Sequence, residues 1–120
     1  IGLPDNVEKL ELPSGYGGID LVMLIDELGT RGLGTVGVEG GGRLIGSLID
    51  LDLVDKVETY IAPVVIGGAE APGPIAGGGA ERLRDAPRLE HVTMQSLGQD
   101  TLITGYVPGH TDHIPGDLSG

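Results

Sequence analysis

Apolar residues follow a helical spacing in two segments of the chain. The first predicted helix covers residues 19–28 and ends at Gly29 or Gly32, either of which can adopt the left-handed conformation of a helix end. A second helix begins near Arg43. One apolar stripe of each helix is expected to face the core: Leu21, Leu24, Ile25 and Leu28 in the first, and Leu44, Ile45, Leu48 and Ile49 in the second.

Strand-like segments surround these helices. The richest in β-branched residues is 56–66, whose later part is almost continuously apolar, as expected of a strand covered on both faces. Pro63 within it marks a bend or an unpaired stretch. The other predicted strands are 7–12, 35–39, 89–97 and 101–107, with a turn at 98–100 that makes the last two a hairpin.

The order of these elements predicts an α/β fold. Alternating strands and helices require right-handed crossovers and parallel pairing, and the final hairpin adds antiparallel strands at an edge. We therefore expect a sandwich with a mixed sheet. Residues 1–107 form the predicted domain, 67–80 a long loop of glycine, proline and alanine, and 108–120 a polar, flexible tail.

Composition narrows the class of protein. The 120 residues suit one domain, and the net charge of −11 argues against partners such as nucleic acid or an anionic membrane surface. The absence of cysteine excludes disulfides and thiol chemistry. No apolar run is long enough to span a membrane, and no signal segment opens the chain, so we expect a cytoplasmic protein. Because the chain begins at Ile1, we expect a preceding partner segment.

The most site-like feature is the transition from residues 35–39 through Gly40, Gly41 and Gly42 to the second helix. A helix N-terminus offers free N–H groups and a positive dipole end, and glycines let a phosphate approach them. Arg43 adds a cation in the first turn. The alternative is a flexible connector whose glycines only make the turn.

Glu39 and the pair Gly67 and Gly68 are also open to two interpretations, a binding role or a purely structural one. Glu39 would place a carboxylate at the ligand-binding end of the sheet, where it could accept hydrogen bonds from a ribose or an amino-pyrimidine. The alternative is a solvated glutamate at a strand end. The adjacent Gly67 and Gly68 permit close approach of a ligand or strand, or make a plain turn.

Histidines give no convincing metal site. His110, Asp112 and His113 are possible ligands, but proline and glycine interrupt their segment, and a flexible tail is the better interpretation. His91 stands alone on a predicted strand. We assign no metal ligand and no catalytic residue.

Several segments, taken together and in order, resemble the reductase domain of riboflavin biosynthesis. They are VEGGGRLIGSL at 38–48, LVDKV at 53–57, YIAPVVIGG at 60–68, RLE at 88–90 and LGQDTLITGY at 97–106. The resemblance covers about residues 7–107. It implies a dihydrofolate-reductase-like three-layer sandwich, in the family of 5-amino-6-(5-phosphoribosylamino)uracil and diaminopyrimidine-phosphate reductases.

The resemblance also implies an activity and a site. The expected reaction is NADPH-dependent reduction of the ribosyl group of a phosphoribosylamino-pyrimidine, whose C1′ accepts a hydride to give the ribitylamino form. It implies that Glu39 binds the substrate. The residues expected to bind the cofactor are Gly40, Gly41, Gly42, Arg43, Leu44, Ile45, Gly46 and Ser47.

The chain departs from the family in two respects. Bacterial members often have proline where Arg43 stands, and the EGGG sequence looks more like the stand-alone or archaeal-type reductases. The N-terminal half of the family domain, with its Ala-x-Ser/Thr-x-Asp-Gly strand, has no counterpart here. We expect only the C-terminal half of the domain, and a homodimer, because an open sheet leaves edges to pair. Alternatives are a non-catalytic nucleotide-binding or association module, or a reductase acting on a pterin-like substrate.

Overall fold

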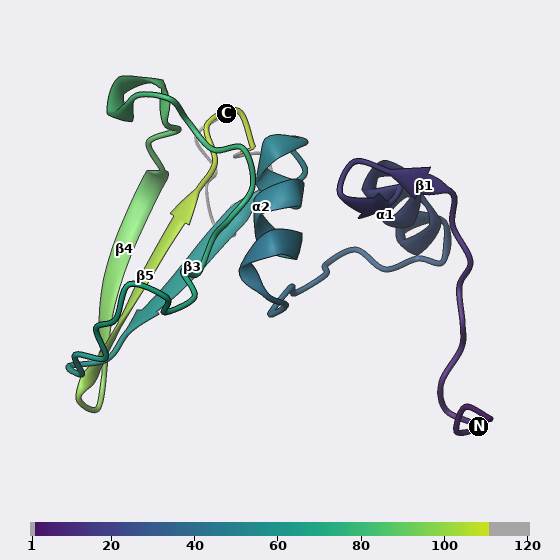
Figure 1. The fold of residues 1–120 in the computed structure, drawn as a ribbon, viewed down its shortest axis with the longest axis horizontal. Coiled ribbons are helices and arrows are strands. Elements are labelled where there is room, and N and C mark those ends of the chain that lie inside the picture. Colours follow the sequence, from purple (N-terminus) through teal and green to yellow (C-terminus); the bar gives the residue numbers. More distant parts are fainter. Residues whose placement is uncertain (1, 111–120) are drawn as a thin grey trace.

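The computed structural model describes residues 2–110 of the chain (Figure 1). Its first half contains a short antiparallel hairpin, β1 (Ser14–Gly15) and β2 (Gly18–Ile19), followed by helices α1 (Leu21–Thr30) and α2 (Gly42–Asp50). In Figure 1, α2 lies between the α1 region and the larger sheet. Both helices confirm the helical spacing of the sequence.

The second half is built around a three-stranded sheet. β3 (Lys56–Ile61) is followed by a long loop, the 3₁₀ turn η1 (Leu83–Asp85), β4 (Glu90–Leu97) and β5 (Asp100–Tyr106). The strand order is β3-β5-β4, and both neighbouring pairs are antiparallel. β5 is thus the central strand, with its Gly105 buried.

The predicted hairpin is confirmed. Leu97 pairs with Asp100, so Gly98 and Gln99 make a two-residue turn between β4 and β5. Gly98 has φ of 61°, a left-handed conformation that glycine adopts without steric cost and that tight hairpins require.

The prediction of a mixed sheet is wrong for the described residues. No strand forms at 7–12 or 35–39, and no two strands between residues 2 and 110 pair in parallel. Strand hydrogen bonds need a neighbouring strand, and these segments find none. β3 also ends at Ile61 instead of continuing to residue 66, because Pro63 has no N–H to donate to a ladder.

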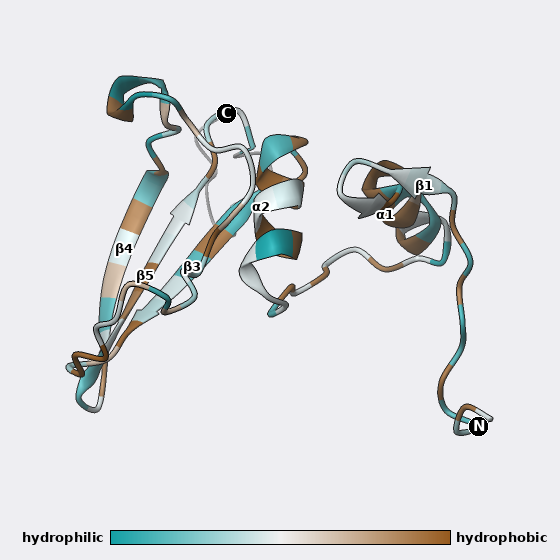
Figure 2. Ribbon diagram, viewed as in Figure 1, coloured by the Kyte–Doolittle hydropathy of each residue, from teal (hydrophilic) through white to brown (hydrophobic). Residues whose placement is uncertain are grey.

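Little of the chain is buried. Among large apolar side chains of the described residues, only Leu21 and Leu48 are less than 9% exposed. The accessible surface is 9739 Å², whereas a compact protein of this mass exposes roughly 6,100 Å². The radius of gyration is 16.9 Å, against about 13.6 Å for a compact domain of this length. Apolar stretches of the sheet and of the loop after β3 are therefore open to solvent (Figure 2).

No helix within residues 2–110 has both the length and the apolar character needed to cross a bilayer.

Candidate functional site

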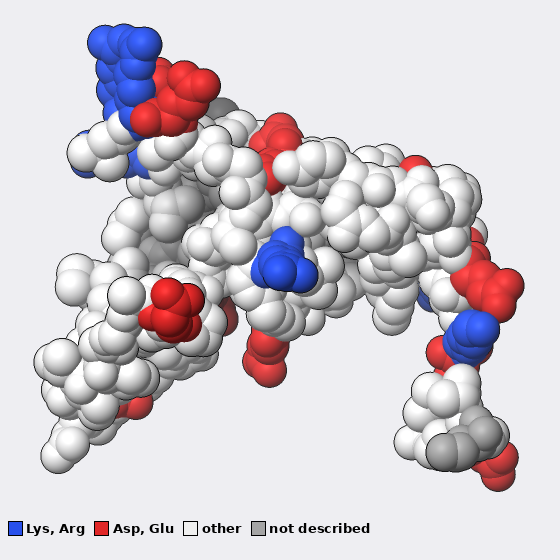
Figure 3. Space-filling view, in the orientation of Figure 1, with Lys and Arg blue, Asp and Glu red and all other residues white. Residues whose placement is uncertain are grey.

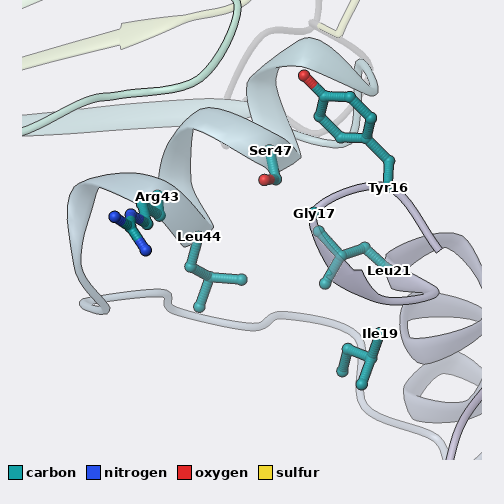
Figure 4. A pocket seen from close by; sticks show the side chains of 7 residues that line it. All are labelled: Tyr16, Gly17, Ile19, Leu21, Arg43, Leu44 and Ser47. Carbon is teal, nitrogen blue, oxygen red and sulfur yellow. The ribbon is translucent and has the colours of Figure 1, made fainter. Parts of the chain in front are cut away.

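A groove runs between helix α2 and the β1–β2 hairpin (Figure 4). Its volume is about 250 Å³, and an adjoining cavity of about 210 Å³ extends it toward Gly77. We call these two cavities the hairpin groove. The residues that line it are Tyr16, Gly17, Ile19, Leu21, Arg43, Leu44, Ser47 and Gly77.

The hairpin groove has a positive end in an acidic chain. Arg43 is the only charged residue among those lining it, and no ion pair is recorded for its guanidinium within residues 2–110. Figure 4 shows Ser47 between Arg43 and Tyr16 along the groove. The main group of basic side chains lies elsewhere, near η1 (Figure 3). An anionic group of a ligand would therefore meet its cation at Arg43.

The N-terminus of α2 is open. Gly41 is the N-cap residue, and no side chain there accepts a hydrogen bond from the first turn. In the part of the chain that the structure describes, no acceptor is recorded for the N–H groups of Gly42, Arg43 and Leu44. A Cβ on Gly41 would have no heavy atom within 4 Å. The helix end thus offers free donors and space.

Two of the predicted cofactor-binding glycines, Gly42 and Gly46, instead contact a loop of the chain itself. A Cβ on Gly42 would lie 2.9 Å from the carbonyl oxygen of Gly73, and one on Gly46 would overlap the carbonyl of Ala76. The Ala76 N–H donates to the Gly42 carbonyl at 2.9 Å. Gly42 and Gly46 therefore let the 73–77 loop lie directly on α2, so this face of the helix is covered by the chain itself.

The remaining predicted site residues are divided between groove and solvent. Arg43, Leu44 and Ser47 line the hairpin groove. Ile45 is half-buried outside it. Glu39 and Gly40 lie in exposed extended chain before α2, because the strand expected at 35–39 does not form.

Asp50 is a functional candidate that the sequence pattern did not single out. Its carboxylate accepts hydrogen bonds from the N–H groups of Gly78 (2.7 Å) and Gly79 (3.2 Å) and from the Tyr16 hydroxyl (3.3 Å). The two backbone donors hold the pKa of the Asp50 carboxyl below its usual range, with the Tyr16 hydroxyl adding to the effect. Asp50 lies outside the apolar stripe of α2 and is exposed, so helical spacing alone does not mark it. The run of glycines at 77–79 is the sequence signal that could have indicated a closely approaching loop.

His110 does not belong to a free tail. Its Nδ1 lies 2.8 Å from Asp55 Oδ1 and its Nε2 lies 3.1 Å from Asp52 Oδ1. The Asp55 hydrogen bond, assisted by Asp52, raises the pKa of His110 above its usual value. Within residues 2–110, no three His, Cys, Asp or Glu side chains are arranged to hold a metal ion. Asp112 and His113 lie outside the described residues.

Comparison with known proteins identifies the family. Residues 4–103 match the RibD C-terminal domain. The chain belongs to the RibD C-terminal domain family. It is 35% identical over 100 residues to the riboflavin biosynthesis protein RibD of Escherichia coli (strain K12), covering 83% of this chain and 27% of that protein. It is 37% identical over 107 residues to RibD of Haemophilus influenzae, and these residues are 89% of this chain and 27% of that protein.

An archaeal relative is matched over a larger share of its length. The 2,5-diamino-6-ribosylamino-4(3H)-pyrimidinone 5′-phosphate reductase of Methanothermobacter thermautotrophicus is 34% identical over 111 residues, which are 88% of this chain and 51% of that protein. The chain thus spans 27% of the length of these two RibD proteins and about half of the length of the archaeal reductase. Family membership confirms the resemblance to riboflavin-biosynthesis reductases that the segments between 38 and 106 carried.

Proposed function

We propose that the chain is part of an NADPH-dependent reductase that converts the ribosyl group of a phosphoribosylamino-pyrimidine to the ribitylamino form. Family membership supports this proposal, as does the activity in the name of the archaeal relative. The proposal includes the dihydrofolate-reductase-like fold of the complete domain, of which this chain would be the C-terminal part.

The open N-terminus of α2, whose first turn contributes Arg43 and Leu44 to the hairpin groove, is the observation that carries the proposal. The free N–H groups of the first turn, the Arg43 guanidinium and the Ser47 hydroxyl are donors suited to phosphate oxygens. Arg43 and Ser47 are four residues apart, so the two side chains lie on the same face of α2. These residues fit an anionic dinucleotide, and we assign the cofactor phosphates to this end of the groove.

Hydride transfer needs little acid–base catalysis from this part of the protein. When bound, NADPH supplies the hydride that C1′ of the sugar accepts. The contribution of this chain is to bind and orient, which is how proteins promote hydride transfer. Glu39 is three residues before the first turn of α2 and exposed, so its carboxylate is free to accept hydrogen bonds from the substrate. We assign it to substrate binding.

We also propose that the exposed apolar surface is covered by protein, either in a homodimer or by the other half of the domain. Val64, Val65 and Ile66 are 70%, 97% and 88% exposed, and the chain exposes far more surface than a compact protein of its mass. Such a surface also favours an association module as the alternative function. Sedimentation velocity at micromolar concentrations tests the homodimer, and a monomer throughout that range argues against it.

Gly41→Asp tests the cofactor site. An aspartate at the N-cap accepts hydrogen bonds from the first turn and so stabilises α2, but its charge repels phosphate. We expect at least about a tenfold loss of NADPH affinity, together with a higher unfolding temperature. Gly34→Asp is the matched control, since Gly34 also has open space around its Cβ but does not cap a helix. Equal NADPH affinity in wild type and Gly41→Asp would overturn the assignment.

A further inference from the structure

One carboxylate joins three segments that are distant in the sequence. Asp50, in the last turn of α2, accepts the Tyr16 hydroxyl from the hairpin and two N–H groups from the 77–79 loop. Tyr16 and Gly77 both line the hairpin groove, in the same cavity as Arg43 and Ser47. Asp50 itself does not line it.

The loop is shaped to reach Asp50. Gly77 and Gly79 have φ of 94° and 66°, in the left-handed region where other residues are strained. A Cβ on Gly77 would lie 2.6 Å from Asp50 Oδ2. The glycines thus permit two successive N–H groups, those of Gly78 and Gly79, to converge on one carboxylate, an arrangement that binds anions well.

The negative charge of Asp50 stands at a position that is unfavourable for the helix itself, which points to a role beyond the helix. A carboxylate in the last turn opposes the negative end of the helix dipole. A neutral residue would suit α2 better if the residue only had to face water. The converging donors from Gly78, Gly79 and Tyr16 offset that cost and lower the pKa of the Asp50 carboxyl.

We propose that Asp50 is a positioning residue for the hairpin groove. Its carboxylate holds Tyr16 and the 77–79 loop against α2, so that Tyr16 and Gly77 complete the cavity that Arg43 and Ser47 also line. This inference rests on the proposed function, because it places the cofactor in the same groove. The inference adds Tyr16 as a binding residue. Its ring would face the ligand, and the anionic group of that ligand would lie at Arg43 and Ser47.

The experiment compares Asp50→Asn, Tyr16→Phe and the double variant with wild type. Asp26→Asn is the control: it removes the same charge from an exposed side chain of α1 that makes no hydrogen bond to any residue between 2 and 110. NADPH affinity is titrated in the full chain, and amide hydrogen exchange is followed at Gly78 and Gly79. Asp50→Asn is expected to weaken NADPH binding about tenfold and to accelerate that exchange, whereas Asp26→Asn changes neither.

The double variant separates positioning from general destabilisation. If Asp50 acts partly through Tyr16, the loss of affinity in the double variant is smaller than the product of the two single losses. Independent losses, or unchanged affinity in Asp50→Asn despite faster exchange, would overturn the proposal. If wild type does not bind NADPH, the proposed function fails instead. Exchange at Gly78 and Gly79 then decides whether Asp50 holds the loop.

Discussion

The two helices are similar in length and end in the same way, but they begin differently. α1 has Asp20 as its N-cap, whose carboxylate accepts the Met23 N–H at 3.0 Å. α2 has Gly41 at this position and leaves its first N–H groups without acceptors in the described chain. The comparison teaches that α1 supplies a side-chain acceptor for an N–H group of its own first turn, whereas α2 keeps such N–H donors available for a ligand.

Their C-termini share one hydrogen-bond pattern. In α1, Gly32 donates to Gly29 and Leu33 donates to Leu28. In α2, Asp52 donates to Ile49 and Leu53 donates to Leu48. This is the Schellman motif, with a left-handed residue just after the helix: Gly32 at φ 82° and Asp52 at φ 57°.

Glycines within the helices provide the largest expected contrast. Gly46→Ala in α2 places a methyl group against the Ala76 carbonyl and is expected to lower the free energy of unfolding by about 1–3 kcal/mol. Gly29→Ala in α1 has open space around its Cβ and is expected to raise it by about 0.5–1 kcal/mol. Urea denaturation followed by circular dichroism measures both changes. Shifts in the same direction would contradict the packing of the 73–77 loop on α2.

The left-handed residues after the helices offer a second contrast, of intermediate size. Gly32→Ala forces a side chain into the left-handed region and is expected to destabilise the chain by about 1 kcal/mol. Asp52→Gly removes that strain from α2 and is expected to stabilise it by about 0.5 kcal/mol. Both are measured by urea denaturation. A destabilised Asp52→Gly variant would mean that the contact with His110 outweighs the backbone strain.

The smallest expected effect concerns pH and the C-terminus of α2. Both nitrogens of His110 face carboxylates, which only accept hydrogen bonds, so the pair of bonds requires the protonated ring. Because the folded-state pKa is raised, the stabilisation is complete below the unfolded value of 6.5 and is lost as pH rises through the folded pKa.

His110→Gln tests this dependence. The difference in unfolding temperature between wild type and the variant should shrink as the pH rises from about 6 to about 9. α1 has no comparable histidine and serves as the reference, since His91 lies on β4. A difference that does not change with pH would show that the two carboxylates do not hold a charged ring.

Both helices and the closing hairpin could be predicted from the sequence, because their hydrogen bonds are local. The spacing of Leu21 and Leu24 predicted the first helix, and the turn at Gly98 predicted the hairpin. The end of the first helix was left open between Gly29 and Gly32, and Gly32 is the left-handed residue. Arg43 was also found as a site candidate from the glycine-rich helix start, whereas Ser47 became a candidate only through the resemblance to the riboflavin-biosynthesis reductases. Whether they bind the cofactor remains a prediction.

The rest depended on contacts between distant segments. Residues 7–12 and 35–39 have the pattern of strands, but a strand exists only where another strand accepts its hydrogen bonds, and the described chain provides none. The sequence pattern did not single out Asp50, because its hydrogen bonds to Tyr16, Gly78 and Gly79 join segments that are about 30 residues away along the chain. The sequence by itself determined the helices, the hairpin and the family. Only the tertiary structure decided the sheet pairing and the walls of the groove, because both arise from residues tens of positions apart.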